Sequence, residues 1–265
     1  MAQTAGFHSS HVRAARLLHT KKHRVAARCF LVEGPALVKA ALDEGIVPQA
    51  VFYVDGRGPD VAAAAALAER TKVPTFAVDE RALDSLAQAR TPQGIVAQIP
   101  FIDRDLTSLE RLVPERGGST LLVLDDLDDP GNAGTLIRSA EAFGVDAVCI
   151  GPKSVDPYND KVLRATMGSI FRVPLVRYES WETLTGALGR LSIRAVAAQA
   201  GAPDIRSVSL PERRALFLGN ETSGLRSFPE KSIALFVGIP QSEGAESLNV
   251  AVAGSILLYE LARCG

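Results

Sequence analysis

The chain has 265 residues, 47% of them hydrophobic, which is enough apolar material for one large domain or two ordinary ones. Its formal net charge of −1 indicates no general preference for an acidic or a basic partner. The three cysteines, Cys29, Cys149 and Cys264, are far apart and form no CxxC pattern, which argues against a disulfide framework and a zinc site.

The first 28 residues form a basic segment that contains all the histidines of the chain and no acidic residue. Its cationic residues are Arg13, Arg16, Lys21, Lys22, Arg24 and Arg28. A solvated arm explains this composition, and so does a surface that contacts the phosphate backbone of RNA. The sequence leaves both interpretations open.

Apolar and helical segments alternate between residues 29 and 100, which predicts a small α/β domain. The predicted strands are residues 29–34, 49–55, 75–79 and 94–99, and the predicted helices are residues 35–45, 61–71 and 80–90. Pro35 and Gly45 stand at the start and the end of the first of these helices, where such residues are favoured.

Residues 101–118 combine proline, charges and a Gly-Gly pair, and we interpret them as a linker with one short helix. A second α/β series occupies residues 119–265. Its predicted strands are residues 120–125, 146–150, 193–199, 215–219 and 234–239. These strands are continuous apolar runs, which is typical of a parallel sheet that is covered on both faces.

Polar loops that contain glycine follow three of these strands, and parallel sheets bind ligands where their strands end. The residues that stand out in the three loops are, in chain order, Asn132, Gly134, Arg138, Asn220, Glu221, Gly224, Ser247, Leu248 and Asn249. Each loop alone could be an ordinary turn, and Ser247 and Asn249 could simply cap the final helix. Three such loops in one domain together favour a nucleotide-like ligand.

The second α/β series lacks the residues that several common enzyme mechanisms require. No histidine lies beyond His23, so a Ser-His-Asp or Cys-His arrangement has no base. The patterns GxxxxGK[ST], GxGxxG and HExxH do not occur, and no cysteines or histidines cluster as zinc ligands do. We therefore expect a reaction that depends on positioning and uses no metal.

The three loops resemble the three signature motifs of the SpoU/TrmH family of RNA 2'-O-ribose methyltransferases. The matching segments are "PGNAGTLIRSAEAFG", "LFLGNETSGL" and "IPQSEGAESLNVAVA", with "DKVLRATMGSIFRVP" (160–174) between the first two. The resemblance covers residues 119–263 in the order and spacing of the family. More loosely, "RCFLVEGPALVKAAL" and "TPQGIVA" are similar to the small substrate-binding domain that precedes the catalytic domain in ribosomal-RNA members.

The resemblance implies an α/β fold class, with a C-terminal trefoil-knot SPOUT methyltransferase domain and a smaller N-terminal α/β domain that is L30e-like. The expected divisions are a basic arm at 1–28, the L30e-like RNA-binding domain at 29–100, a linker at 101–118 and the knotted domain at 119–265. It also implies a homodimer formed through the C-terminal domain, with the active site completed across the interface.

The family's cofactor is S-adenosylmethionine, and the resemblance assigns the residues that would bind it. These are Gly219, Asn220, Glu221, Gly224, Ile239, Pro240, Ser247, Leu248 and Asn249. The implied catalytic residues are Asn132, Arg138, Glu221, Ser247 and Asn249. RNA contacts are expected from the six cations of the basic segment. Arg164 and Ser169 are expected to contact either RNA or the second copy of the dimer.

The resemblance places Arg138 at the attacking ribose hydroxyl, where the family residue has been described as the base. A guanidinium keeps its proton near neutral pH, so we expect Arg138 to grip the adjacent phosphate and stabilise the developing alkoxide. Asn132, Glu221, Ser247 and Asn249 are expected to orient Arg138, the cofactor and the ribose. Glu221 has an alternative interpretation as the partner of an arginine that only fixes the loop.

The N-terminal domain favours ribosomal RNA of the large subunit as the substrate. Transfer RNA, protection against an antibiotic that targets the ribosome, and an inactive RNA-binding protein of the same fold stay open as alternatives. The chain lacks the apolar core of a signal peptide and any apolar stretch of ~20 residues, so we expect a soluble cytoplasmic protein.

Overall fold

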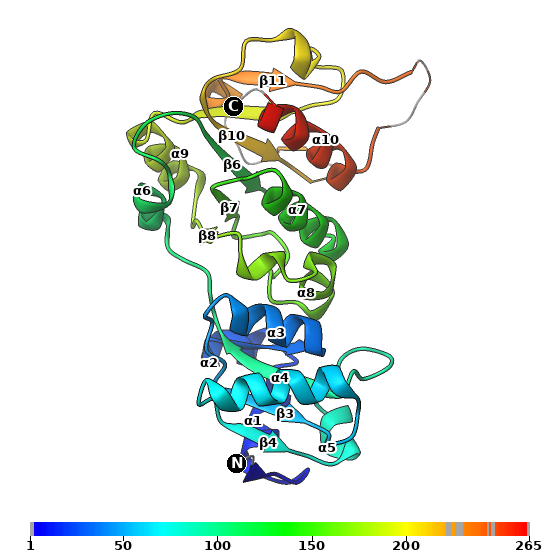
Figure 1. Cartoon of the computed structure of the whole chain (residues 1–265). Helices are drawn as coiled ribbons and strands as arrows, with labels where there is room; N and C mark the ends of the chain where they lie inside the picture. Colours follow the sequence, from blue (N-terminus) through cyan, green and yellow to red (C-terminus); the bar gives the residue numbers. More distant parts are fainter. Residues whose placement is uncertain (1–2, 221–223, 226–229, 243, 245–246, 264–265) are drawn as a thin grey trace. The chain divides into compact units, whose positions relative to one another are not determined.

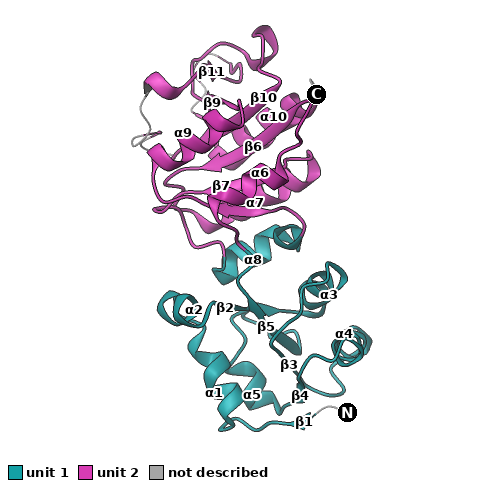
Figure 2. Ribbon diagram, turned by 90° about the vertical axis from the view of Figure 1, so that its left-hand side faces the viewer, with its two compact units in different colours: residues 1–102, 158–171 teal, residues 103–157, 172–265 magenta. Residues whose placement is uncertain are grey.

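Two β-sheets organise the chain in the computed structural model, which describes residues 3–220, 224–225, 230–242, 244 and 247–263. Unit 1 consists of the described residues up to 102 together with 158–171, and unit 2 consists of 103–157 and the described residues from 172 onward (Figures 1 and 2). No helix within these described ranges is long and apolar enough to cross a membrane.

Unit 1 contains a five-stranded mixed sheet with the order β1-β4-β3-β5-β2. Its strands are β1 Gln3–Thr4, β2 Cys29–Glu33, β3 Ala50–Tyr53, β4 Thr75–Ala77 and β5 Ile95–Pro100. The first three neighbours in this order are parallel, whereas β5 is antiparallel to both β3 and β2. This antiparallel pairing places the end of β2 beside the beginning of β5.

Helices cover both faces of this sheet. The helices of unit 1 are α1 Ser10–Leu17, α2 Lys21–Ala27, α3 Pro35–Asp43, α4 Pro59–Arg70, α5 Glu80–Asp84 and α8 Asp160–Thr166, with a 3₁₀ turn, η2, at Ser169–Phe171. On one face α1 and α5 bury Val12, Ala15 and Leu83 against the sheet residues Phe52 and Phe76. Helices α3 and α4 pack against each other and against β2, β3 and β5.

The basic segment is folded, because its apolar residues complete the core of unit 1. Val12, Ala15 and Leu18 have relative exposures of 3% or less and belong to the same buried cluster as the sheet. The expected arm is therefore corrected: its described residues, 3–28, contain strand β1 and helices α1 and α2 of unit 1. The basic side chains lie on a folded surface or within it.

Residues 158–171 pack with unit 1, although they lie between strands of unit 2 in the sequence. The Tyr158 ring stacks with Phe30 and with Phe101, at centroid distances of 4.4 and 4.2 Å. Its hydroxyl accepts a hydrogen bond from the backbone N–H of Ile102 at 2.9 Å. The expected division, with a first domain at 29–100 and a linker at 101–118, is thus incomplete, since residues 158–171 also belong to the first unit.

Unit 2 contains a six-stranded sheet with the order β11-β9-β10-β6-β7-β8, in which every pair is parallel. Its strands are β6 Ser119–Leu124, β7 Ala147–Ile150, β8 Leu175–Arg177, β9 Arg194–Ala198, β10 Arg213–Leu218 and β11 Leu235–Val237. The five strands predicted in this region are confirmed. Strand β8 was not among them, because Pro174 and Arg177 leave only Leu175 and Val176 as an apolar run, whereas the equally short β11 lies within the apolar run at 234–239.

Helices also cover both faces of the second sheet. Its helices are α6 Leu109–Leu112, α7 Pro130–Ala142, α9 Trp181–Arg190 and α10 Val250–Arg263, with short 3₁₀ turns η1 Leu106–Ser108, η3 Ile205–Ser207 and η4 Glu230–Ser232. Helices α6 and α9 share one buried cluster with the sheet, while α10 packs on α7 and β10 (Figure 1). Gly254 permits this approach, since a β-carbon there would lie 2.4 Å from Leu218 and 2.5 Å from Leu136.

Candidate active site

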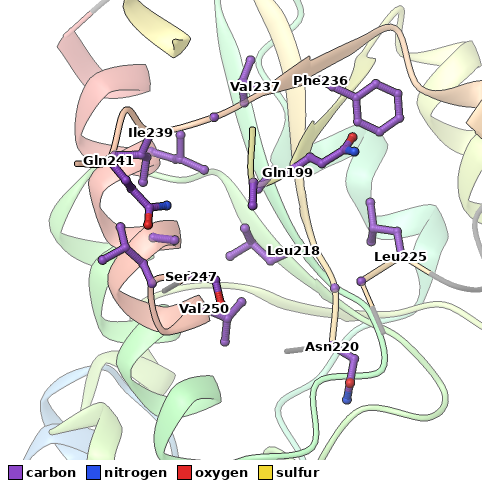
Figure 3. Close-up of a pocket in the computed structure, with 18 of the residues that line it drawn as sticks. Gln199, Leu218, Asn220, Leu225, Phe236, Val237, Ile239, Gln241, Ser247 and Val250 are labelled. Carbon is purple, nitrogen blue, oxygen red and sulfur yellow. The ribbon is translucent and has the colours of Figure 1, made fainter. Parts of the chain in front are cut away.

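A cavity of about 420 Å³ lies at the carboxyl ends of β9, β10 and β11 in unit 2. The chain reaches it again immediately before and within α10, through Ser247, Leu248, Val250 and Ala253. In Figure 3, Ile239 and Gln241 lie on one side of the cavity, and Leu225 and Phe236 lie on the other. Because all these strands are parallel, their ends meet at one edge. Of the three polar loops that the sequence singled out, those after β10 and β11 line the cavity and the loop after β6 does not.

Two glycines allow backbone segments to meet at the edge of this cavity. A β-carbon on Gly219 would lie 2.5 Å from the carbonyl carbon and oxygen of Gly224, and one on Gly238 would lie 2.5 Å from the carbonyl oxygen of Ala202. Both distances are shorter than real β-carbon contacts, so any side chain would force the backbone to move. Main-chain groups rather than side chains therefore shape this part of the wall.

The loop after β10 is fixed by hydrogen bonds at both of its described ends. The backbone of Asn220 donates to Gly224 at 3.2 Å and accepts from it at 2.8 Å. The Asn220 side-chain Nδ2 donates to the carbonyl oxygen of Asp126 at 3.1 Å and to Asp128 Oδ2 at 3.0 Å. Asn220 thus connects the cavity to the loop that follows β6.

A hydrogen bond between two asparagines joins the starts of α7 and α10. Asn249 Nδ2 donates to Asn132 Oδ1 at 3.0 Å, and Asn249 Oδ1 accepts from the backbone N–H groups of Ala251 and Val252 at 2.9 and 3.2 Å. The capping interpretation of this stretch is therefore confirmed for Asn249. The same side chain also donates to Asn132, another predicted site residue, so capping does not prevent Asn249 from making a second contact.

Arg138 lies on α7 six residues after Asn132, which is about 9 Å along the helix axis. Its side chain is exposed and makes no hydrogen bond or ion pair with the described part of the chain. Asn132 and Asn249 are thus hydrogen-bonded to each other, and Arg138 forms no hydrogen bond with either. Glu221 lies outside the described residues.

The cavity contains most of the predicted cofactor residues and several that the sequence reading missed. Gly219, Asn220, Gly224, Ile239, Ser247 and Leu248 line it, whereas Pro240 and Asn249 flank lining residues without lining it themselves. The missed residues include Gln199 after β9 and Gln241 after β11. The loop after β9 has no glycine-rich signature, but the rule that ligands bind at strand ends could have identified it.

Two of the predicted RNA-binding arginines have structural roles in unit 1, which corrects their assignment. Arg24 is only 6% exposed, and its Nη1 donates to the carbonyl oxygens of Leu18 and His19 at 3.0 Å each. Arg16 is half-buried, and its Nη2 donates to Ser85 Oγ at 2.9 Å. Both guanidinium groups are engaged by the fold, so neither is presented to a polyanion.

Ser169 is corrected as well, because it is 2% exposed and cannot reach RNA from this position. Arg164 is partly exposed and forms an ion pair with Asp160 at 2.7 Å, one helical turn away. The side chains of the remaining predicted contacts are exposed: Arg13, Lys21, Lys22 and Arg28. RNA contacts by these four residues and by Arg164 stay predictions.

A buried carboxyl group lies at the end of the neighbouring strand β6. Asp125 is 2% exposed, and its Oδ1 accepts a hydrogen bond from the Tyr178 hydroxyl at 3.4 Å. Burial, with a further contribution from the charge of Asp126, raises the pKa of the Asp125 carboxyl to about 7. Among the described residues, no group of three or more side chains is arranged to hold a metal ion.

Comparison with known proteins identifies the family to which this arrangement belongs. The model of the SpoU rRNA Methylase family matches residues 119–259, and that of the MRM3-like substrate binding domain matches residues 9–97. The chain belongs to the SpoU rRNA methylase family. The family resemblance that the loop motifs indicated is therefore confirmed, and the substrate-binding match includes most of the basic segment.

Known members of this family resemble the present chain over nearly its whole length. The Bacillus subtilis protein named 23S rRNA (guanosine(2553)-2'-O)-methyltransferase RlmP is 34% identical over 98% of this chain and 99% of its own. The AdoMet-bound rRNA methyltransferase from Sinorhizobium meliloti has a TM-score of 0.82 and 30% identity, and covers 100% of this chain and 98% of its own.

The SpoU methyltransferase AviRb from Streptomyces viridochromogenes, in complex with AdoMet, has a TM-score of 0.84 and 25% identity. The match covers 97% of this chain and 98% of AviRb. Together, the family models and these structures confirm the predicted fold class, a SPOUT methyltransferase domain that follows a smaller α/β domain.

Proposed function

We propose that this chain transfers the methyl group of S-adenosylmethionine to a ribose 2'-hydroxyl of large-subunit ribosomal RNA. The observation that carries the proposal is the cavity at the ends of β9, β10 and β11, which opens beside the paired Asn132 and Asn249. The names of the relatives, a 23S rRNA 2'-O-methyltransferase and an AdoMet-bound rRNA methyltransferase, support the same donor and acceptor.

The residues present fit S-adenosylmethionine. The cavity volume of about 420 Å³ falls within the roughly 300–1,000 Å³ that small-molecule sites occupy. Leu218, Phe236 and Ile239 offer apolar contact to a flat base, while Gln199 and Gln241 offer amide groups to the polar parts. Gly219 and Gly238 add no side chain to the wall, so a ligand can approach the backbone closely at both positions.

When bound, S-adenosylmethionine supplies an activated methyl group on a sulfur that leaves as a neutral thioether. The residues of the chain then have to align the acceptor and stabilise the oxygen that loses its proton. Alignment of two reactants can contribute roughly 7–11 kcal/mol to a reaction of this kind. Asn132 and Asn249 fix the two helix starts at the mouth of the site, which is the positioning role that we assign to them.

We assign Arg138 to the RNA rather than to the donor. Its exposed guanidinium can grip a phosphate bidentately and stabilise a developing alkoxide, whereas the cavity wall is formed by other residues. The substitution Arg138→Lys keeps the positive charge but removes the planar, bidentate guanidinium. Turnover should therefore fall about 100-fold, while the affinity for the methyl donor is unchanged. Near-normal turnover of this variant would contradict the bidentate role.

We further propose that the chain acts as a homodimer in the cytoplasm, with α10 in the subunit interface. Val252, Ile256 and Tyr259 recur every three or four residues on this helix and have relative exposures of 48, 37 and 48%. Leu248, which lines the cavity, extends this apolar stripe, so a second copy of the chain would lie beside the site. Light scattering of Ile256→Lys should report a monomer where the wild type is a dimer.

The proposal is tested by incubating the protein with tritiated S-adenosylmethionine and either ribosomal or transfer RNA. We expect label on large-subunit RNA, at a ribose position that primer extension at low nucleotide concentration can map. Label on transfer RNA alone would replace the acceptor, and no label on any RNA or assembling subunit would refute the transferase.

A further inference from the structure

Two sequence motifs of unit 1 lie next to each other in the structure. Neither of them lines the cavity. The motif around Glu33 and Gly34 ends β2, and the motif "TPQG" at 91–94 precedes β5. These two strands are neighbours in the sheet and antiparallel, so the end of one lies beside the start of the other. A structural contact thus joins residues that are about sixty positions apart in the sequence.

The Glu33 carboxylate binds three backbone N–H groups of the loop at residues 87–93. Its Oε2 accepts from Gln88 and Ala89 at 2.9 and 3.0 Å, and its Oε1 accepts from Gln93 at 3.3 Å. One side chain therefore holds the loop at both of its ends. We refer to residues 87–93 as the clamped loop.

The clamp also explains why helix α5 is shorter than the sequence predicted. The strong helix formers of residues 80–90 predicted a helix over this whole range, but α5 ends at Asp84. The N–H groups of Gln88 and Ala89 are directed to Glu33 instead of to helical carbonyl groups. Gly34 is favoured as well, because its φ of 98° is a backbone conformation that residues with a β-carbon rarely adopt.

The composition of the clamped loop indicates that it binds a polyanion that also carries hydrogen-bonding groups, as the base edges of RNA do. Gln88, Arg90, Thr91 and Gln93 are exposed, and the loop contains no acidic residue. Arg90 has no ion pair or hydrogen bond within the described part of the chain. None of the exposed large apolar side chains recorded for the described residues lies in this loop, so it lacks the anchor of a protein-protein interface.

We propose that the clamped loop is a surface with which unit 1 reads the RNA substrate, and that Glu33 is its positioning residue. Arg90 contacts a phosphate, while the amides of Gln88 and Gln93 hydrogen-bond to base edges in an unpaired segment. The inference rests on the proposed function and adds a specific recognition site to it. A loop held on a rigid sheet binds with less loss of conformational entropy than a free one.

Glu33→Gln separates this role from plain electrostatics. The change removes a negative charge, which by itself strengthens RNA binding, but it also replaces an acceptor oxygen with an NH₂ group that faces a backbone N–H. We expect the Kd and KM for RNA to rise about fivefold or more, while kcat at saturating RNA and the Kd for S-adenosylmethionine stay unchanged. Glu44→Gln is the matched control, because Glu44 is exposed at the end of α3 and holds no loop.

Arg90→Gln tests the surface without disturbing the clamp. We expect the Kd for RNA to rise about five- to tenfold and the slope of log Kd against log salt to fall by about 1. Arg70→Gln is the matched control, since Arg70 is an exposed arginine at the end of α4 outside the loop. If Glu33→Gln fails to fold, Arg90→Gln together with Gln88→Ala decides the inference.

The outcomes distinguish this inference from the proposed function. Wild-type protein that labels RNA while Glu33→Gln and Arg90→Gln bind it as tightly as their controls would overturn the clamped loop alone. Wild-type protein that transfers no label would overturn the transferase. Weaker RNA binding by both variants, with unchanged affinity for S-adenosylmethionine, supports the role of the clamped loop in RNA recognition.

Discussion

The carboxyl ends of the parallel strands in unit 2 form one edge of the sheet, and the two halves of this edge differ. One half surrounds a cavity, and the other is closed by side chains. At the ends of β9, β10 and β11, the edge is open and surrounds the cavity. At the ends of β6, β7 and β8, Asp125, Gly151 and Tyr178 close it, and a β-carbon on Gly151 would lie 2.6 Å from the Tyr178 hydroxyl oxygen. The neighbouring Ser154 is buried and bridges the chain segments after β6 and β7.

This difference shows that a parallel sheet supplies the edge, while side chains decide which part of it can hold a ligand. In the open half, glycines let the backbone form the wall. In the closed half, polar side chains are buried to support the loop that leads to Asn132. We therefore expect substitutions in the closed half to change stability and those in the open half to change donor affinity.

Asp125→Asn should produce the largest effect, and it tests the closed half. The raised pKa of about 7 means that the folded state retains a proton that the unfolded chain releases near pH 4. Stability is therefore lost as the pH rises from about 4 to 7. Asn carries no charge, so the variant should exceed the wild type in unfolding free energy by up to about 4 kcal/mol at pH 8.

Urea unfolding of unit 2 can measure this difference, because Trp181 is the single tryptophan and lies in that unit. The advantage of Asp125→Asn should shrink steadily as the pH is lowered towards 4. The same pH dependence in both proteins would show that the carboxyl does not titrate in this way.

Gly219→Ala tests the open half. The added β-carbon would lie 2.5 Å from the Gly224 carbonyl group, so the backbone at Gly219 or Gly224, both of which line the cavity, would have to shift. We expect the Kd for S-adenosylmethionine to rise about 100-fold, or about 2.7 kcal/mol, as measured by calorimetry. Gly189→Ala in α9, where a β-carbon meets nothing within 4 Å, should leave the Kd unchanged.

The same contrast between buried and exposed polar groups recurs among the basic residues of unit 1. Arg24→Gln removes two hydrogen bonds from a buried guanidinium and should lower the free energy of unfolding by about 2 kcal/mol. Lys22→Gln, at an exposed site in the same helix, should change it by less than about 0.5 kcal/mol. Equal melting temperatures for the two variants would contradict the structural role of Arg24.

Substitutions of Asn249 should change stability less than Arg24→Gln does, and they separate the capping role of this side chain from its pairing with Asn132. Asn249→Ala loses the helix cap and should cost about 1 kcal/mol, whereas Asn249→Asp keeps an acceptor for Ala251 and Val252. Neither variant can donate to Asn132, so both should lower kcat by a similar factor. Full activity of Asn249→Asp would show that only the cap matters.

Local patterns predicted much of this protein. The continuous apolar runs located five of the six strands of unit 2, and the polar loops after β10 and β11 contain the six predicted cofactor residues that line the cavity. Asn249 could be identified as a cap because capping depends on neighbours within three residues. These features are encoded by residues close together in the sequence, which is why the sequence alone determined them.

Only the tertiary structure decided which residues meet across the sheets. Gln199 lines the cavity because β9 lies beside β10 and β11, and Glu33 ends α5 early because β2 pairs with β5. Burial likewise separated Arg24 from Lys22, although both stand in one basic run. The physical reason is the same in each case: strand pairing and core packing bring together groups far apart in the chain, and no local period records those contacts.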